Sequence, residues 1–305
     1  MSSRADPAVY MRRWTVQILT VLALLAVTGT PEAPTTPPRP KVGYVLVESR
    51  KTVSPAGERA SSQRGSVTVL GGTARWDLET GAFPRTKANT LLLGDREGWL
   101  VDRKASVAAQ AGVEDVRGLF VPPAEGDPGP FQSALSDLEV PPAELGSGPS
   151  FEGSPTTRLR VSASWSLVTA MPGRVGRVRC KLTASLDAVA DPPEGTLSPL
   201  DDLGRLFDVP PRVLEALGPE LARLRGFPVR VVVETEAELG VDYPGTAAPP
   251  SDGRAPLRTR TETTRTVSGL VARPSTVEDA ALFALSEETR VVGIERLVEP
   301  RESLR

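Results

Sequence analysis

The chain has 305 residues, which is enough to bury the core of one large domain or two small ones. Its 36 basic and 38 acidic residues are mixed along the sequence and leave a net charge of −2, so the composition gives no field that attracts nucleic acid or anionic lipid. Without histidine, and with Cys180 as its single cysteine, the sequence excludes a Ser-His-Asp triad, a histidine-ligated zinc and an intrachain disulfide.

The N-terminal residues have the pattern of a secretory signal. Met11-Arg12-Arg13 precede an apolar run, Trp14 to Val27, that small residues follow. The run is shorter than the roughly 20 residues that span a membrane. We therefore predict a signal peptide at residues 1–29, with Met1 or Met11 as the start; the alternatives are an uncleaved anchor and a buried helix. No cysteine stands where a lipid-anchoring signal requires one.

A segment rich in proline and threonine follows at residues 30–41. Closely spaced prolines favour extended polyproline conformations and do not pack as helix or sheet, so this segment is predicted to be a tether. One folded domain is predicted at residues 42–299, with a short tail at 300–305.

The first part of the domain consists of short β-type runs separated by turn signals. In the first run, Tyr44 and Leu46 share one face. The dipeptide Gly71-Gly72 between the second and third runs suits a two-residue hairpin turn. The predicted strands lie at residues 43–50, 63–70, 73–79, 89–93 and 98–103.

Residues 122–156 are rich in proline, glycine, serine and acidic residues. We interpret them as a disordered surface insert and not as a domain linker, because the β pattern is alike on both sides.

The clearest hairpin comes next. Between residues 158 and 167, and again between 178 and 186, apolar residues alternate with polar ones, and Pro172-Gly173 suits the turn. Such strands form a sheet with one dry and one wet face. Cys180 falls on the dry face, which favours a buried structural thiol over a reactive one.

Two helical segments follow, at residues 198–207 and 211–225. Ser198 and Pro199 are typical of a helix start, and each segment has a single apolar side. Gly218-Pro219 is expected to kink or split the second helix, and Gly226 to end it.

The last part returns to strands. Antiparallel pairing of residues 229–238 with 257–270 brings Arg258 and Arg260 near Glu236 and Glu238. Ser275 and Glu278 predict a capping box for one turn of helix. Two more strands are predicted, at residues 282–285 and 291–297.

The carboxylates are the obvious candidates for catalysis. However, Glu234, Glu236 and Glu238 share the solvent face of one predicted strand with arginines opposite, which favours a solvated face over an acid/base pair. Asp201 and Asp202 stand where acids complement a helix dipole, and no glycine-rich phosphate loop precedes a helix. We predict no enzyme activity, no catalytic residue, no metal and no cofactor.

Five segments of the sequence carry a resemblance to a known family: Ala74 to Leu78, Leu91 to Asp102, Gly176 to Cys180, Leu224 to Arg230 and Leu282 to Leu285. Together they resemble the lipoprotein-carrier (LolA/LppX-like) superfamily and its uncharacterised bacterial envelope families. The resemblance covers most of residues 43–297, and it departs from the family in the long insert and in the missing lipobox. It implies an α+β, mainly β fold: a curved antiparallel sheet, an incomplete barrel, with helices covering the concave face. The resemblance further implies that members which carry acyl chains or lipidated proteins hold them between sheet and helices.

We therefore expect a periplasmic or otherwise extracytoplasmic protein that binds an apolar ligand, such as an acyl chain, between sheet and helices. Its partner would be a lipid, a lipidated protein or an envelope protein, and it would contact the membrane only through the signal. The alternative is a structural or sensory envelope module with a closed core. The candidate lining residues are Trp76, Trp99, Trp165, Leu203, Leu206, Phe207, Leu214 and Leu217.

Overall fold

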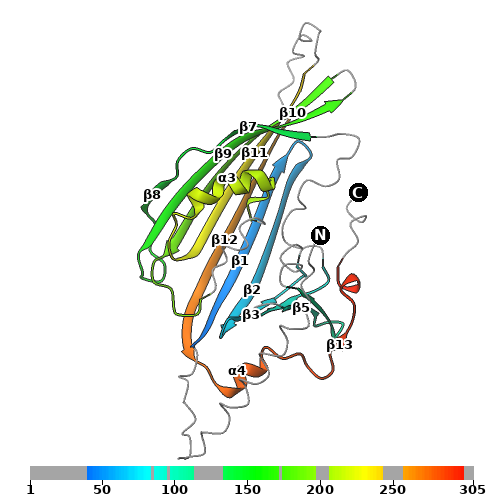
Figure 1. Cartoon of the computed structure of the whole chain (residues 1–305), viewed down its shortest axis with the longest axis vertical. Helices are drawn as coiled ribbons and strands as arrows, with labels where there is room; N and C mark the ends of the chain where they lie inside the picture. Colours follow the sequence, from blue (N-terminus) through cyan, green and yellow to red (C-terminus); the bar gives the residue numbers. More distant parts are fainter. Residues whose placement is uncertain are drawn as a thin grey trace, which may run out of the picture. The chain divides into compact units, whose positions relative to one another are not determined.

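The domain is mainly β, and its strands form one large sheet (Figure 1). The computed structural model describes residues 40–83, 86–94, 97–112, 133–171, 174–196, 206–242 and 257–298, all within one compact unit, Pro38–Arg305. The predicted signal peptide, the tail and most of the predicted tether lie outside the described residues; Pro40 and Lys41, at the end of that tether, already belong to the first strand.

The sheet has 13 strands in the described part of the chain and does not close on itself. Its order is β13-β6-β5-β4-β3-β2-β1-β12-β11-β10-β9-β7, and β8 also pairs with β9. The strands are β1 Pro40–Ser54, β2 Gly57–Leu70, β3 Thr73–Leu78, β4 Thr90–Leu93, β5 Glu97–Asp102, β6 Val107–Gly112, β7 Ser133–Glu139, β8 Glu144–Ser147, β9 Thr156–Met171, β10 Arg174–Val189, β11 Phe227–Asp242, β12 Leu257–Pro274 and β13 Arg290–Val291.

Most neighbouring strands are antiparallel hairpins, as predicted. Gly71 and Gly72 adopt φ values of 58° and 91°, which a two-residue turn between β2 and β3 requires. The pairing of β11 with β12 sets Glu236 opposite Arg260 and Glu238 opposite Arg258, which confirms the predicted register. The central strand β1 pairs with β2 on one side and β12 on the other, so the two ends of the domain meet in the sheet.

One face of the sheet carries the core. Along β1, Val42, Tyr44 and Leu46 are buried, whereas the residues between them are partly exposed. The same alternation continues through β9, β10 and β11, and it produces three apolar clusters on this face. We call them the helix cluster (β7 to β11), the central cluster (β1 to β3 with the start of β11) and the C-terminal cluster (β3 to β6 with Leu297).

Helix α3, Pro211–Leu221, lies across β9, β10 and β11 and packs against the helix cluster (Figure 1). Val213 and Leu217 are its buried residues, one turn apart, and Pro219 lies inside its last turn. The predicted helix at 198–207 is described only at Leu206 and Phe207, which are helical. None of the described helices is long and apolar enough to cross a membrane.

The expected disordered insert differs from the structure in its second half. Residues 133–139 and 144–147 form β7 and β8, which both pair with β9. Sequence pattern does not anticipate them because each is short and lies in a segment rich in proline, glycine and acidic residues. Residues 122–132 lie outside the described part.

The C-terminal predictions were partly wrong. The capping box is formed by Thr276 and Asp279, one residue later than predicted, and it begins helix α4, Val277–Ala281. Asp279 also binds Lys41 at 2.5 Å, which ties α4 to the first strand. Residues 282–285 form turns after α4, and the predicted strand at 291–297 becomes the end of β13 and a short 3-10 helix, η3 Ile294–Arg296.

A buried ion pair interrupts the apolar face. Arg265 of β12 is 2% exposed and contacts Glu48 of β1 through Nε at 2.7 Å. Strand register places both side chains on the core face. Leu46 pairs with Val267 on that face, and Glu48 pairs with Arg265 two residues away on each strand. A buried ion pair is worth little against apolar side chains of similar size, but losing one partner leaves a charge without compensation.

We expect Arg265→Ala to lower the free energy of unfolding by about 3–5 kcal/mol, because Glu48 would remain enclosed without a counter-charge. The matched control is Arg258→Ala, which removes an exposed ion pair with Glu238 and should cost less than about 1 kcal/mol. Urea denaturation of both variants measures the difference. Equal costs would show that the Arg265 pair is not enclosed.

Candidate functional site

The helix cluster brings five of the eight predicted lining residues together. Trp165 lies on β9, Leu206 and Phe207 precede α3, and Leu214 and Leu217 are on α3 itself. Four of them are buried and Leu214 is partly buried against the same cluster. They face the inward side chains of β10 and β11.

The other predicted lining residues lie elsewhere. Trp76 joins the central and C-terminal clusters, where its ring meets Phe83 edge-on at 5.0 Å. Trp99 pairs with Leu92, whereas Leu91 pairs with Trp76, so Trp99 is on the opposite face of the sheet from Trp76. Leu203 lies outside the described residues.

Side chains fill the contact between α3 and the sheet. Phe207, Val213 and Leu217 have no solvent-accessible surface, so none of them borders a void that holds a water molecule. A ligand therefore has no room at these three positions unless α3 moves.

A polar clamp holds the C-terminal half of α3. The amide of Ala143, in the segment between β7 and β8, donates to Glu220 Oε2 at 2.7 Å. Arg223 donates to the same carboxylate at 2.8 Å and to the Ala143 carbonyl at 2.9 Å. The hydrogen bond from Ala143, and then that from Arg223, lower the pKa of Glu220. At the other end, Pro210 offers no side-chain cap, and Asp208 forms an exposed ion pair with Arg50.

An open groove of about 410 Å³ runs between α3 and β7. Leu135 and Leu138 of β7 lie along it, and both also pack against the helix cluster. From α3 it is bordered by Arg212, Glu215 and Ala216.

Trp165 belongs to the same helix cluster as Leu135 and Leu138, but it does not itself line the groove. Its neighbours on β9 pair with Ser136 and Glu139, so Trp165 lies opposite the irregular part of β7 that contains Leu138. The side chain is 4% exposed, and its indole Nε1 has no hydrogen-bond partner in the described part of the chain. A buried N–H without a partner costs about 1–3 kcal/mol, and native structures contain few such groups.

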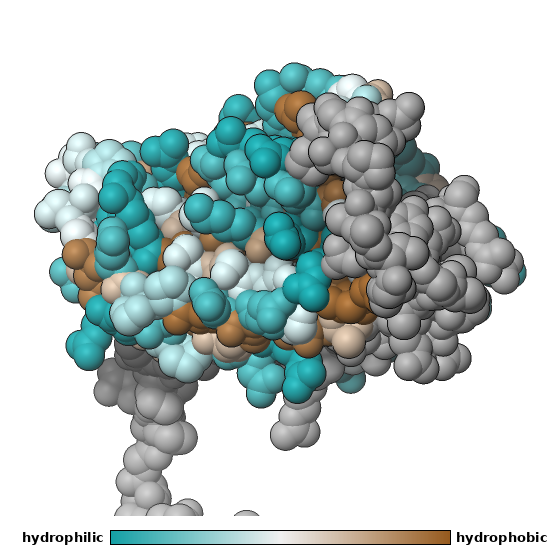
Figure 2. All heavy atoms as spheres, turned by 90° about the horizontal axis from the view of Figure 1, so that it is seen from above, coloured by the Kyte–Doolittle hydropathy of each residue, from teal (hydrophilic) through white to brown (hydrophobic). Residues whose placement is uncertain are grey.

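The wet face behaves as the sequence predicts. Arg258 contacts Glu238 at 3.0 Å, and Arg260 contacts Glu234 at 2.5 Å, so these carboxylates are partly exposed and paired. Cys180 is partly buried on the core face, and burial raises the pKa of its thiol. Among the described residues, no three acidic or cysteine side chains gather as a metal site. Seen from one end of the long strands, the surface is mainly hydrophilic, with small apolar patches (Figure 2).

Sequence reasoning missed the Ala143 clamp and the buried Arg265. The burial of Arg265 could have been predicted, because Arg265 is two residues from the inward Val267 and therefore lies on the same face of the strand. The clamp could not have been predicted from a local pattern, because Ala143 is 77 positions from Glu220 and 80 positions from Arg223.

Comparisons with known proteins add little. No protein-family model and no curated protein matches the sequence. Among solved structures, one similar chain is a domain from Vibrio parahaemolyticus provisionally described as an outer membrane lipoprotein-sorting protein. It is 10% identical, the match covers 79% of this chain and 91% of that one, and the TM-score is 0.25. A TM-score this low supports neither a shared family nor a shared function.

The Glu220 clamp predicts a pH dependence. Because the folded-state pKa of Glu220 is lowered from 4.5, the clamp contributes fully above that value and is lost as pH falls through the lowered one. We expect amide-exchange protection of residues 211–221, corrected for intrinsic rates, to fall as pH drops from about 6 to about 3.

Glu220→Gln should remove this dependence, and Glu215→Gln, on the same helix but outside the clamp, should retain it. The reverse pattern would contradict the assignment.

Proposed function

We propose that the protein is exported and that its domain binds an apolar ligand such as an acyl chain between the sheet and α3, without catalysing a reaction. The ligand would be a lipid or the lipid part of a lipidated protein. The compartment rests on the N-terminal sequence, whose short charged start and apolar run are typical of a secretory signal.

The observation that carries the proposal is the Nε1 atom of Trp165. It is a hydrogen-bond donor buried in the helix cluster, and Leu135 and Leu138 of the groove pack against that same cluster. A ligand that combines an apolar chain with a carbonyl or carboxyl oxygen suits both properties, because the oxygen can accept the N–H and the chain can bury against leucines. A lipid acyl group has both parts.

The groove provides the entry and α3 the movable wall. About 410 Å³ is within the size range of ligand pockets, and one wall of the groove is a single helix. Because Val213 and Leu217 leave no void, a bound chain must take the place of part of the α3 contact. Binding then depends on the apolar area removed from water, about 25 cal/mol per Å² before association costs.

The alternative, a module whose core stays closed and which acts through protein partners, is favoured by the complete burial of Phe207, Val213 and Leu217. In that case Trp165 is only a core residue with an unpaired N–H. The two functions differ in one respect that can be measured, namely whether an apolar ligand reaches Trp165.

We expect palmitate to change the tryptophan fluorescence of the full-length protein, because the acyl chain reaches the surroundings of Trp165. The change should disappear in Trp165→Phe and persist in Trp99→Phe, whose ring is on the other face of the sheet. Ala216→Trp, which fills the groove beside α3, should weaken binding by about tenfold or more.

Native mass spectrometry of protein purified from its own membranes provides the second measurement. Added mass that corresponds to a lipid supports the proposal. A single unliganded mass together with unchanged fluorescence would establish the closed module instead.

A further inference from the structure

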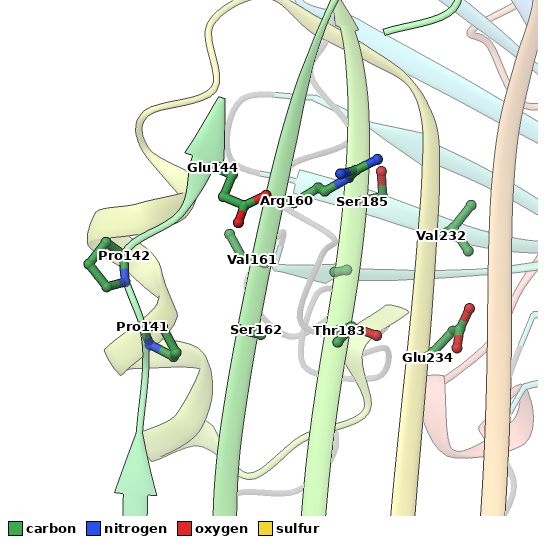
Figure 3. Close-up of a pocket in the computed structure, with 11 residues that line it drawn as sticks. Pro141, Pro142, Glu144, Arg160, Val161, Ser162, Thr183, Ser185, Val232 and Glu234 are labelled. Atoms are coloured by element: carbon green, nitrogen blue, oxygen red, sulfur yellow. The ribbon is translucent and has the colours of Figure 1, made fainter. Parts of the chain in front are cut away.

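A polar groove of about 360 Å³ lies on the wet face of the sheet, behind the helix cluster (Figure 3). It occurs where the edge strands are interrupted. β7 pairs with β9 as far as Ser164, and β8 resumes the pairing at Arg160. Between them, Pro141 and Pro142 have no N–H to donate and cannot continue the ladder.

The floor consists of outward side chains from three adjacent strands. Strand register arranges them in two rows across β9, β10 and β11. Figure 3 shows Glu144 beside the Arg160 row and the two prolines along the side of the groove. The rows are Arg160, Ser185 and Val232, and Ser162, Thr183 and Glu234.

Most polar groups of this floor are uncommitted, which distinguishes them from their neighbours; the exception is Glu234, whose carboxylate pairs with Arg260 at 2.5 Å. One row away, Arg158 is held by Asp187 through two contacts, at 2.6 and 2.9 Å. Arg160 forms no ion pair or hydrogen bond with any described residue, nor do the hydroxyl groups of Ser162, Thr183 and Ser185. The groove therefore offers a guanidinium and three hydroxyl groups to a ligand.

The charge of the groove restricts that ligand. A guanidinium binds a carboxylate or a phosphate through paired hydrogen bonds. Here Glu144 and Glu234 line the same groove, and like-charge repulsion disfavours a dianion such as phosphate. The hydroxyl groups and the two carboxylates can instead bind the hydroxyl groups of a ligand. Pro141, Pro142 and Val232 offer apolar surface to its C–H groups.

We propose that this groove binds a hydroxyl-bearing monocarboxylate, of the sugar-acid class, with Arg160 on the carboxylate. This second site is independent of the acyl site. Arg160 and Ser162 face away from the helix cluster, whereas Leu159 and Val161, which alternate with them along β9, point into it.

Titration calorimetry and saturation-transfer NMR of the full-length protein test the proposal with glucuronate, glucose and inorganic phosphate as probes. Glucuronate should bind, and glucose and phosphate should bind at least about tenfold more weakly. Arg160→Gln should weaken glucuronate binding by at least about tenfold, while Arg179→Gln, an exposed arginine of β10 outside this groove, should change it by less than about twofold.

Melting temperatures equal to that of the wild-type protein would show that neither substitution disturbs the fold. The proposal is overturned if glucuronate does not bind, if glucose or phosphate binds equally well, or if Arg160→Gln binds as the wild type does. Palmitate binding by Arg160→Gln should stay unchanged, so failure of this site and failure of the acyl site are distinguishable.

Discussion

The alternation of side chains along β9 to β12 determines which residues form the core and which face water, because each strand is packed on one face and wet on the other. Trp165 and Leu182 point toward α3, and so Ser164 and Thr183 must point toward water. A slip of one residue in any of these strands would expose the core and bury the charges. The burial beneath α3 therefore also fixes the positions of Arg160 and its neighbours on the far face.

Helix α3 depends on the sheet for its existence. Isolated helices of 11 residues are marginal in water, and this one contains Gly218 and Pro219 and has no side-chain cap at its start. Its stability comes from burying Val213 and Leu217 and from the clamp at Ala143. A ligand that enters beneath it must offer a comparable apolar surface, at roughly 1.5–3 kcal/mol for each large side chain displaced. A long acyl chain meets that condition and a small polar molecule does not.

Local pattern predicted most of the strands, and long-range contacts decided the rest. Alternation and turn residues placed the hairpin of β9 and β10 and the facing charges of Glu238 and Arg258 correctly, since both follow from period and register. Strands β7 and β8 escaped prediction because both are short and lie in a segment rich in proline, glycine and acidic residues, with no alternation of apolar and polar residues that predicts a strand. The candidate site was predicted in part: pattern identified the leucines of α3, but it could not tell that Trp99 faces away, because register across β3, β4 and β5 determines that.

The four residues between β7 and β8 do not pair with β9, and this interruption affects both faces of the sheet. Pro141 and Pro142 end the edge pairing and leave room for the polar groove. The chain then returns inward at Ala143, which is 7% exposed, and its amide, freed from the sheet, binds Glu220. In the present arrangement that amide donates to α3 and not to a neighbouring strand. The interruption of the edge thus supplies a contact that holds the helix where it is, and the groove is the space that the same interruption leaves on the opposite side.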